Sequence, residues 1–264
     1  MSDRKILFIP IYNCEKQISR VLQKLTTQVQ EVFDEIILVN NLSTDASEAA
    51  AIEGCREHIK IKATVLRNRQ NYGLGGSHKV AFKYALKYGY DYCLVLHGDD
   101  QGEIEDIMGH LKKGEHHKYD CLLNSRFMPG SLRRGYSKVR TAGNLVFNLL
   151  FSVATRRLQW DLGSGLCCYS CKFLLSGIPN RCSDDLTFNY TLQLLASANG
   201  VSQKFFPSSW VEDDQISNVK LFRQTVQMLK ILLAYICCLR PSSLNFSSKS
   251  KFTYDADIVF QQSV

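Results

Sequence analysis

A short acidic cluster after an apolar run is the part of this sequence best suited to chemistry. Asp99 and Asp100 follow the apolar residues 91–96, and His97 lies just before them. Hard divalent cations such as Mg²⁺ and Mn²⁺ prefer carboxylate oxygens and keep coordination positions for substrate phosphates. One of the acids could instead cap a helix that begins near residue 103. Capping explains one acid but not the cluster, which therefore favours a divalent metal site.

Other polar segments also follow apolar runs, at residues 10–13, 40–45 and 67–73. Asn40 and Asn41 can each donate and accept hydrogen bonds, which suits the edge of a nucleotide base, although asparagine pairs are common where strands end. Residues 43–45 precede a helical pattern and suit either an N-cap or a phosphate site. Residues 71–77 are glycine-rich but match neither a Walker A loop nor a GxGxxG fingerprint.

The elements that must position these residues alternate along the first half of the chain. Short apolar runs at 5–11, 35–40, 61–66, 91–96 and 119–124 are typical of buried strands. Helical spacing separates them, as in Ile18, Val21, Leu22 and Leu25. This alternation predicts a mainly parallel sheet covered by helices on both faces. The polar segments should then meet at the carboxyl edge of the sheet, where ligands bind.

The second half has a different character. Residues 126–140 are basic and 145–153 amphipathic, residues 161–169 are rich in Gly, Ser and Cys, and residues 183–185 open an apolar helix. A long helix is predicted over 219–239, followed by a Ser-rich linker or loop at 241–251. Apolar segments 145–154 and 228–239 fall short of the ~20 residues needed to span a membrane, but each could lie on its surface.

Composition excludes several classes of protein. The 264 residues are 45% hydrophobic and 22% charged, which excludes a disordered or fibrous chain. The net charge is +7, and residues 111–157 alone carry ten Lys/Arg against two acids. We therefore expect an anionic partner there, but no nucleic acid. The ten cysteines lack zinc-finger spacing and no signal peptide is evident, so free thiols in the cytoplasm are expected.

The successive motifs resemble those of family 2 glycosyltransferases, which have the GT-A fold. The resemblance covers roughly residues 4–240 and rests on the order and spacing of segments 9–15, 39–45, 71–73, 97–101, 125–127, 161–165 and 210–212. It is nearest to the branch of polyprenyl-phosphate sugar transferases and bacterial surface-glycan enzymes. It implies an α/β, Rossmann-like sheet flanked by helices, with a helical acceptor-side extension. Residues 1–125 would bind the donor, 126–240 the acceptor, and 241–264 would form a tail.

The same resemblance implies an inverting glycosyltransferase of polysaccharide biosynthesis. It would use a nucleotide-sugar donor, Mg²⁺ or Mn²⁺, and a lipid-linked acceptor, either a polyprenyl phosphate or a growing glycan. The residues expected at the nucleotide sugar are Pro10, Tyr12, Glu15, Asn40, Asn41, Ser43, Asn71, Gly73 and Asp99. Asp99 would bind the metal with help from His97, and Asp184 or Asp185 would be the general base. The family usually has acids where this chain has Asn40, Asn41 and His97.

The basic stretch predicts contact with a membrane. The amphipathic segment is preceded by Lys138, Arg126, Arg133, Arg134 and Arg140, and followed by Arg156 and Arg157. Arg126, Arg133, Arg134 and Arg140 are the candidates for binding the acceptor or its phosphate. Basic residues beside an apolar helical face are typical of a segment at an anionic membrane surface. The protein would then be peripheral on the cytoplasmic face. Alternatively, the apolar stripe is core and the arginines are a solvated face.

Two other functions stay open at this level. A nucleotidyltransferase shares the nucleotide-binding sheet but should have a basic, glycine-rich loop after the first strand, where this chain has Pro-Ile-Tyr-Asn-Cys-Glu. A catalytically silent nucleotide-binding protein with the GT-A fold would fit the loss of the first acid of the metal motif. The presence of Asp99, Asp184 and Asp185 opposes this last alternative.

Overall fold

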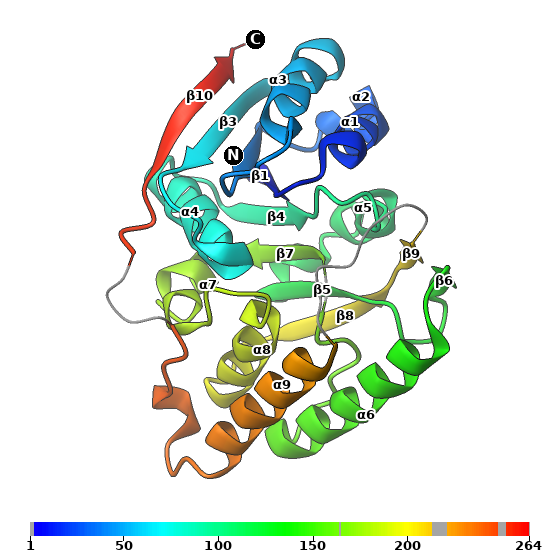
Figure 1. The fold of residues 1–264 in the computed structure, drawn as a ribbon, viewed down its shortest axis with the longest axis vertical. Coiled ribbons are helices and arrows are strands. Elements are labelled where there is room, and N and C mark those ends of the chain that lie inside the picture. Colours follow the sequence, from blue (N-terminus) through cyan, green and yellow to red (C-terminus); the bar gives the residue numbers. More distant parts are fainter. Residues whose placement is uncertain (1–2, 164, 213–220, 248–251, 264) are drawn as a thin grey trace.

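The computed structural model describes residues 3–163, 165–212, 221–247 and 252–263. Within them an eight-stranded sheet runs in the order β10-β3-β2-β1-β4-β7-β5-β8 (Figure 1). Its strands are β1 (Lys5–Ile11), β2 (Glu35–Asn40), β3 (Lys62–Asn68), β4 (Tyr92–Leu96), β5 (Cys121–Ser125), β7 (Leu166–Ser170), β8 (Gln203–Pro207) and β10 (Ala256–Gln262). A separate pair joins β6 (Leu132–Arg134) to β9 (Ser209–Val211).

The sheet is mainly parallel, as predicted, and contains two antiparallel strands. β7 lies antiparallel between β4 and β5, and β10 lies antiparallel on β3. The sequence predicts no strand at residues 161–169, yet β7 begins within them at Leu166. It also predicts no strand in the tail, residues 241–264, whereas β10 completes one edge of the sheet. Strands from both halves of the chain therefore share one sheet.

Helices cover both faces of the sheet, because successive strand residues point to opposite sides. In β1, Ile6 and Phe8 pack in one core cluster, while Leu7 and Ile9 pack in another. The first cluster lies under α4 (Gly73–Lys87), α7 (Cys171–Leu175) and α8 (Phe188–Ala198). The second lies under α1 (Glu15–Lys24), α2 (Thr27–Gln30), α3 (Ser47–His58) and α5 (Glu105–Lys112). Three short 3₁₀ turns are η1 (Glu115–His117), η2 (Pro179–Arg181) and η3 (Pro241–Ser243).

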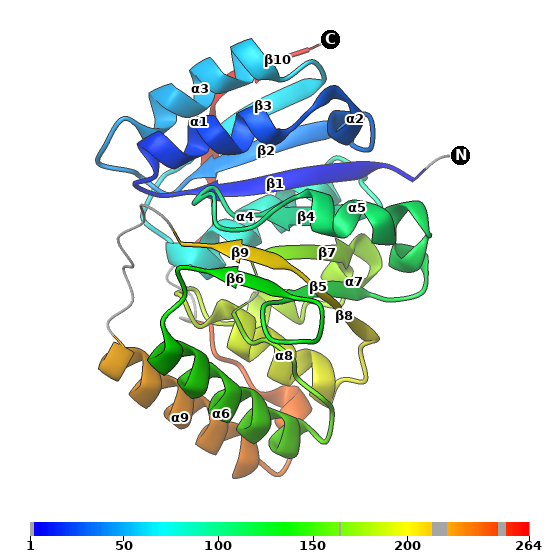
Figure 2. The ribbon, with the colours of Figure 1, turned by 90° about the vertical axis from the view of Figure 1, so that its right-hand side faces the viewer.

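Two long helices, α6 (Lys138–Thr155) and α9 (Leu221–Ile236), lie side by side at the end of the molecule farthest from β10 (Figures 1 and 2). Their inner residues form a third core cluster with α8, including Phe151, Leu194, Met228 and Tyr235. The helix predicted over 219–239 is thus observed as α9, and residues 219–220 lie outside the described part. Among the described residues, no helix combines the length and apolar character needed to cross a membrane.

Candidate functional site

A pocket of about 620 Å³ lies at the carboxyl ends of the parallel strands. The loops after β1, β2, β3 and β4 line one side of it, which confirms that these polar segments meet at one edge. Residues of α6, α8 and α9 line the other side. The volume is in the range of small-molecule sites. Of the predicted site residues, those that line it are Pro10, Tyr12, Asn41, Asn71, Gly73, His97, Asp99, Arg126, Arg140 and Asp185.

Asn41 organises the strand-end side of the pocket. Its Nδ2 donates to Asn71 Oδ1 at 2.8 Å, and its Oδ1 accepts from the backbone N–H of Tyr72 at 2.9 Å. Gly73 follows with φ +75°, and a Cβ there would lie 2.4 Å from the backbone oxygen of Asp184. Glycine is therefore required for this turn to pack against the loop before α8.

Three residues predicted at the nucleotide lie outside the pocket lining. Asn40 Nδ2 donates to Glu48 at 2.8 Å, and its Oδ1 accepts from the backbone N–H of Ser43 at 2.9 Å. Ser43 Oγ accepts from the backbone N–H of Asn13 at 3.1 Å. The Glu15 carboxylate accepts a backbone N–H just before α3 at 3.4 Å. These contacts fix the shape of the loops after β1 and β2.

His97 and Asp99 enter the same pocket from the loop after β4. Burial raises the pKa of Asp99 to about 6, and burial, with a smaller contribution from Arg126, lowers the pKa of His97 to about 4. His97 Nε2 is buried and has no hydrogen-bond partner within the described residues. A poorly solvated carboxylate and an unpaired imidazole nitrogen are groups that gain from a bound cation.

The Asp100 side chain has different contacts from that of Asp99. Its φ is +60°, and its carboxylate lies 2.7 Å from Arg20 Nε and 2.8 Å from Lys24 Nζ. It is not part of the pocket lining. The acidic cluster seen in the sequence thus separates into one pocket carboxylate and one carboxylate paired with α1.

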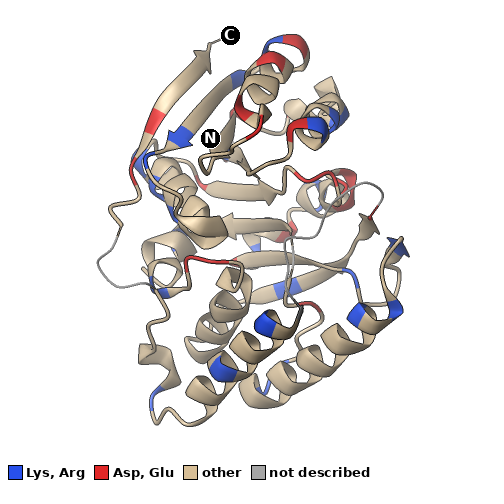
Figure 3. Cartoon of the chain, in the orientation of Figure 1, with Lys and Arg blue, Asp and Glu red and all other residues tan. Residues whose placement is uncertain are grey.

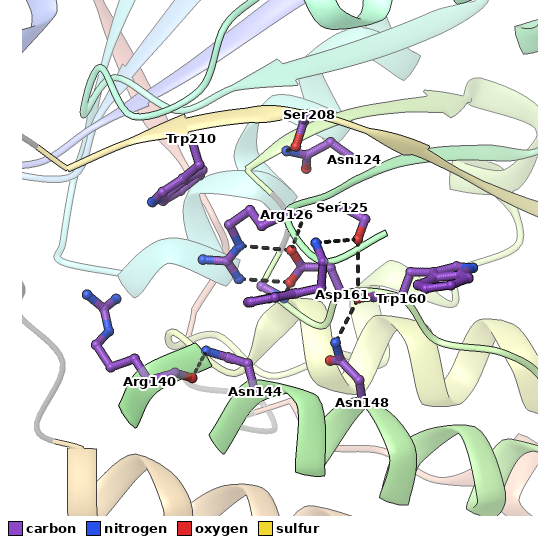
Figure 4. A network of polar contacts seen from close by, with 12 residues as sticks. Asn124, Ser125, Arg126, Arg140, Asn144, Asn148, Trp160, Asp161, Ser208 and Trp210 are labelled. Atoms are coloured by element: carbon purple, nitrogen blue, oxygen red, sulfur yellow. Dashed lines mark hydrogen bonds and ion pairs between the residues drawn. The ribbon is translucent and has the colours of Figure 1, made fainter. Parts of the chain in front are cut away.

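A buried ion pair between Arg126 and Asp161 lies beside the pocket, on the side of α6 (Figure 4). Asp161 is fully buried and accepts from Arg126 Nε and Nη2, each at 2.8 Å. Burial opposes the charge of Arg126, but Asp161 outweighs it and raises the pKa of the guanidinium. The Arg126 guanidinium carbon also lies 4.7 Å from the Trp210 ring centroid. Opposite charge and an aromatic face together hold this arginine at the pocket wall.

The other predicted arginines divide between the pocket and its surroundings. Arg140, on α6, pairs with Glu212 at 2.7 Å and lines the pocket. Arg133 is exposed and donates to the backbone oxygen of Arg126, so it supports that loop. Arg134 is exposed and outside the lining. Arg126 is buried, which differs from the membrane-facing position that the basic stretch implied.

The two candidate bases have different surroundings. Asp184 is buried, and its Oδ1 lies 2.6 Å from Lys79 Nζ and 2.7 Å from the Tyr254 hydroxyl. It lies outside the pocket lining, whereas Asp185 is part of it. Because Asp184 is buried outside the pocket lining and its Oδ1 contacts Lys79 and Tyr254, it is poorly placed to take a proton from an acceptor.

Asp185 is held by four donors. Its Oδ1 accepts from Ser183 Oγ at 2.8 Å and from the Thr187 backbone N–H and hydroxyl at 2.8 and 2.5 Å. Its Oδ2 accepts from Gln227 of α9 at 2.6 Å. Burial would raise the pKa of Asp185, but these hydrogen bonds lower it below the usual value. The carboxylate is therefore a weak base that joins the start of α8 to α9.

Sequence reasoning missed several lining residues. Trp210 lines the pocket, and Asp161 pairs with the lining residue Arg126; both belong to motifs recognised in the sequence, yet no role in the site was assigned to either. Others gave no local signal, because long helices bring them to the pocket: Tyr136, Asn144, Asn189, Tyr190, Gln224 and Met228.

The chain belongs to glycosyl transferase family 2. The family model, described as "Glycosyl transferase family 2", matches residues 6–178. Because this match covers well over half of the chain, it assigns a glycosyltransferase and leaves the nucleotidyltransferase alternative without support.

Comparisons with individual proteins agree with the family assignment. The chain is 25% identical over 181 residues to the UDP-N-acetylglucosamine–dolichyl-phosphate N-acetylglucosaminyltransferase of Methanococcus voltae, covering 64% of this chain and 71% of that protein. It superposes on glucosyl-3-phosphoglycerate synthase of Mycobacterium tuberculosis, solved with Mn²⁺, UDP-glucose and phosphoglyceric acid, with TM-score 0.66, 15% identity and coverage of 99% and 90%. A complex of that enzyme with phosphoglyceric acid gives TM-score 0.65 and 17% identity, with coverage of 88% and 80%. These structures support the GT-A fold.

Proposed function

We propose that this protein is an inverting glycosyltransferase that moves a sugar from a nucleotide sugar to a polyprenyl phosphate at an anionic membrane surface. The observation that carries the proposal is a single pocket with two unlike sides. Asn41, Asn71 and Asp99 lie on its strand-end side, and helices α6 and α9 form the other. The M. voltae relative, whose name pairs a UDP-sugar with a lipid phosphate, supports the same donor and acceptor classes.

The donor side fits a divalent metal, and we assign Mn²⁺. Asp99 offers a desolvated carboxylate and His97 an unpaired Nε2 in the same pocket. A mixed oxygen and imidazole set suits Mn²⁺ better than Mg²⁺, which prefers oxygen ligands alone. When bound, the metal would neutralise charge on the leaving diphosphate. Asn41 and the 71–73 turn would position the nucleotide.

Donor binding can be tested by thermal denaturation with UDP-, GDP- and CDP-sugars in the presence of Mn²⁺. We expect a UDP-sugar to raise the melting temperature most, because the M. voltae relative is named for a UDP-sugar. A ligand that binds only the folded state raises its stability more when it binds more tightly. Omitting Mn²⁺ should weaken the effect. If no nucleotide sugar shifts the transition, the proposed donor class is wrong. Hydrolysis of the nucleotide sugar with and without Mn²⁺ then separates the enzyme from a catalytically silent nucleotide-binding protein.

The chemistry of Asp185 supports an acceptor that is already ionised. A sugar hydroxyl needs a general base, and such catalysis contributes about 10²–10⁴-fold. Four hydrogen bonds hold Asp185 as a carboxylate of lowered pKa. A lipid phosphate carries its own negative oxygen and needs no base. We therefore assign Asp185 to positioning the α8–α9 wall.

We expect Asp185→Asn to lower the melting temperature while reducing kcat by less than about tenfold, well below the loss of a general base. The hydrogen bonds at the start of α8 are worth about 1 kcal/mol in comparable caps, so the stability loss should be measurable by denaturation. A kcat loss of about 100-fold or more, with the slope of the pH–rate profile abolished, would instead identify Asp185 as the base.

The outer faces of α6 and α9 support membrane contact. Both helices have exposed apolar residues at helical spacing. On α6 these are Val139, Val146, Leu149 and Val153, and on α9 they are Phe222, Leu229, Leu233 and Ile236. Neither helix contains an acidic residue, and both carry Lys or Arg (Figure 3). Apolar helical faces with basic residues bind anionic interfaces.

Sedimentation with vesicles of phosphatidylglycerol and phosphatidylcholine tests this contact. At low salt the protein should pellet, and the pair Leu149→Gln and Val153→Gln should reduce the bound fraction several-fold, because buried apolar area drives interfacial binding. A matched pair, Leu175→Gln and Ile258→Gln, changes exposed apolar residues on other elements and should bind normally. Equal binding of both pairs would show that α6 is not the contact.

A further inference from the structure

A second group of potential ligands lies far from the pocket, at the amino ends of the parallel strands. Asp3 precedes β1, and His116 and His117 form part of η1, between α5 and β5. One ligand atom from each of these three residues lies within 4.8 Å of the others. Figure 2 shows the start of β1 on the side of the molecule where α5 lies.

The distances within this group suit one ion. Asp3 Oδ2 lies 2.5 Å from His117 Nε2 and 3.6 Å from His116 Nε2. Ligands of a tetrahedral metal at the usual Zn–N distance of ~2.0–2.1 Å lie about 3.3 Å apart, so only small side-chain shifts are needed. The two imidazole rings are 4.0 Å apart between centroids, and both face the same carboxylate.

The surroundings of His116 give a second reason, besides the distances, to expect a bound ion here. Its exposure is 4%, and neither ring nitrogen has a hydrogen-bond partner within the described residues. The Tyr92 ring packs edge-on against it at 4.8 Å. A buried imidazole without a partner is costly unless a group outside the chain satisfies it.

Space for such a group is present. A cavity of about 670 Å³, separate from the candidate active site, is lined by His116, His117 and Asp3. Asp120 and Ser170 also line this cavity. The geometry points to a Zn²⁺ site formed by Asp3, His116 and His117, with water or another small ligand in the fourth position. Two imidazoles and one carboxylate are a ligand set that Zn²⁺ accepts.

The metal would link two parts of the chain that are distant in sequence. It would tie the residues before β1 to η1, more than 110 positions away in sequence. Lys5 opposes it, because its Nζ lies 3.7 Å from Asp3 Oδ2 and competes with a cation for that oxygen. Removing this ammonium should therefore tighten metal binding, an effect that a merely structural role for the histidines would not produce.

Calorimetric titration with Zn²⁺ tests the site, using the full-length chain freed of any polyhistidine tag and stripped of metal. The Asp99→Asn background removes the candidate active-site ligand. We expect one equivalent to bind, with affinity at least about tenfold weaker in Asp3→Asn and in His117→Asn, since loss of one of three ligands is felt strongly. His117 is exposed, so its substitution leaves the core intact. Lys5→Met should bind more tightly.

His58→Asn is the matched control, because His58 is a partly exposed histidine on α3, outside the cluster. Its affinity for Zn²⁺ should equal that of the parent. The same series in wild-type protein with excess Mn²⁺, the ion assigned to the Asp99 site, covers the case in which Asp99→Asn fails to fold. Absence of Zn²⁺ binding, or equal binding by the Asp3, His117 and His58 variants, would overturn the proposal.

Discussion

Asp99→Asn is expected to abolish sugar transfer, with kcat falling by about 10³-fold or more. The metal assigned to this carboxylate would stabilise charge on the leaving diphosphate by several kcal/mol, and about 4 kcal/mol corresponds to about 10³ in rate. Asparagine keeps the shape of the side chain but removes the negative charge that holds the cation. Steady-state turnover in Mn²⁺, with melting temperature to confirm folding, measures the effect.

The neighbouring residue provides the control. Asp100 differs from Asp99 by one position, but its carboxylate faces Arg20 and Lys24 and lies outside the pocket. Asparagine also tolerates the positive φ found there. Asp100→Asn should therefore keep most activity. Near wild-type turnover of Asp99→Asn, or an equal loss in both variants, would contradict the assignment of Asp99.

Asp161→Ala is expected to produce the largest loss of stability, about 3–5 kcal/mol, because it leaves the Arg126 guanidinium buried without its counter-charge. Asp161 is fully buried and forms two side-chain hydrogen bonds to Arg126 and one to the backbone N–H of Gly163 at 2.9 Å. Transfer should fall as well, since Arg126 would no longer be held at the pocket wall. Equilibrium unfolding in urea measures the change.

The pair Arg140–Glu212 is the appropriate comparison. Its side chains are 23% and 18% exposed, so water partly compensates when it is broken. Glu212→Gln should therefore cost about 1 kcal/mol or less. If Asp161→Ala costs no more than Glu212→Gln, the buried pair does not stabilise the acceptor side as described.

Much of the donor side could be predicted from local patterns. Apolar runs and helical spacing identify the strands and helices, and a parallel sheet then places Asn41 and Asp99 at one edge. The glycine at position 73 was recognisable as part of a turn. Its actual requirement, close packing against the backbone of Asp184, arises from two segments distant in sequence.

The acceptor side was less predictable because its contacts are long-range. Arg126 was assigned to an acceptor or phosphate, but burial by Asp161 and Trp210 is a tertiary effect that charge patterning does not show. The strand β10 was missed for a similar reason. Its sequence has little alternation, and its antiparallel pairing with β3, as between Ile258 and Leu66, forms only in the folded chain.

The most direct test of the proposed function is transfer of a radiolabelled sugar from UDP-sugar donors, with Mn²⁺ and anionic vesicles that contain polyprenyl phosphate. Parallel reactions contain polyprenyl alcohol, which lacks the phosphate, or 3-phosphoglycerate, a water-soluble phosphate. We predict that label enters the lipid fraction only with polyprenyl phosphate, and that the product has the anomeric configuration opposite to that of the donor. Transfer to 3-phosphoglycerate or polyprenyl alcohol instead, or retention of configuration, would contradict the proposal.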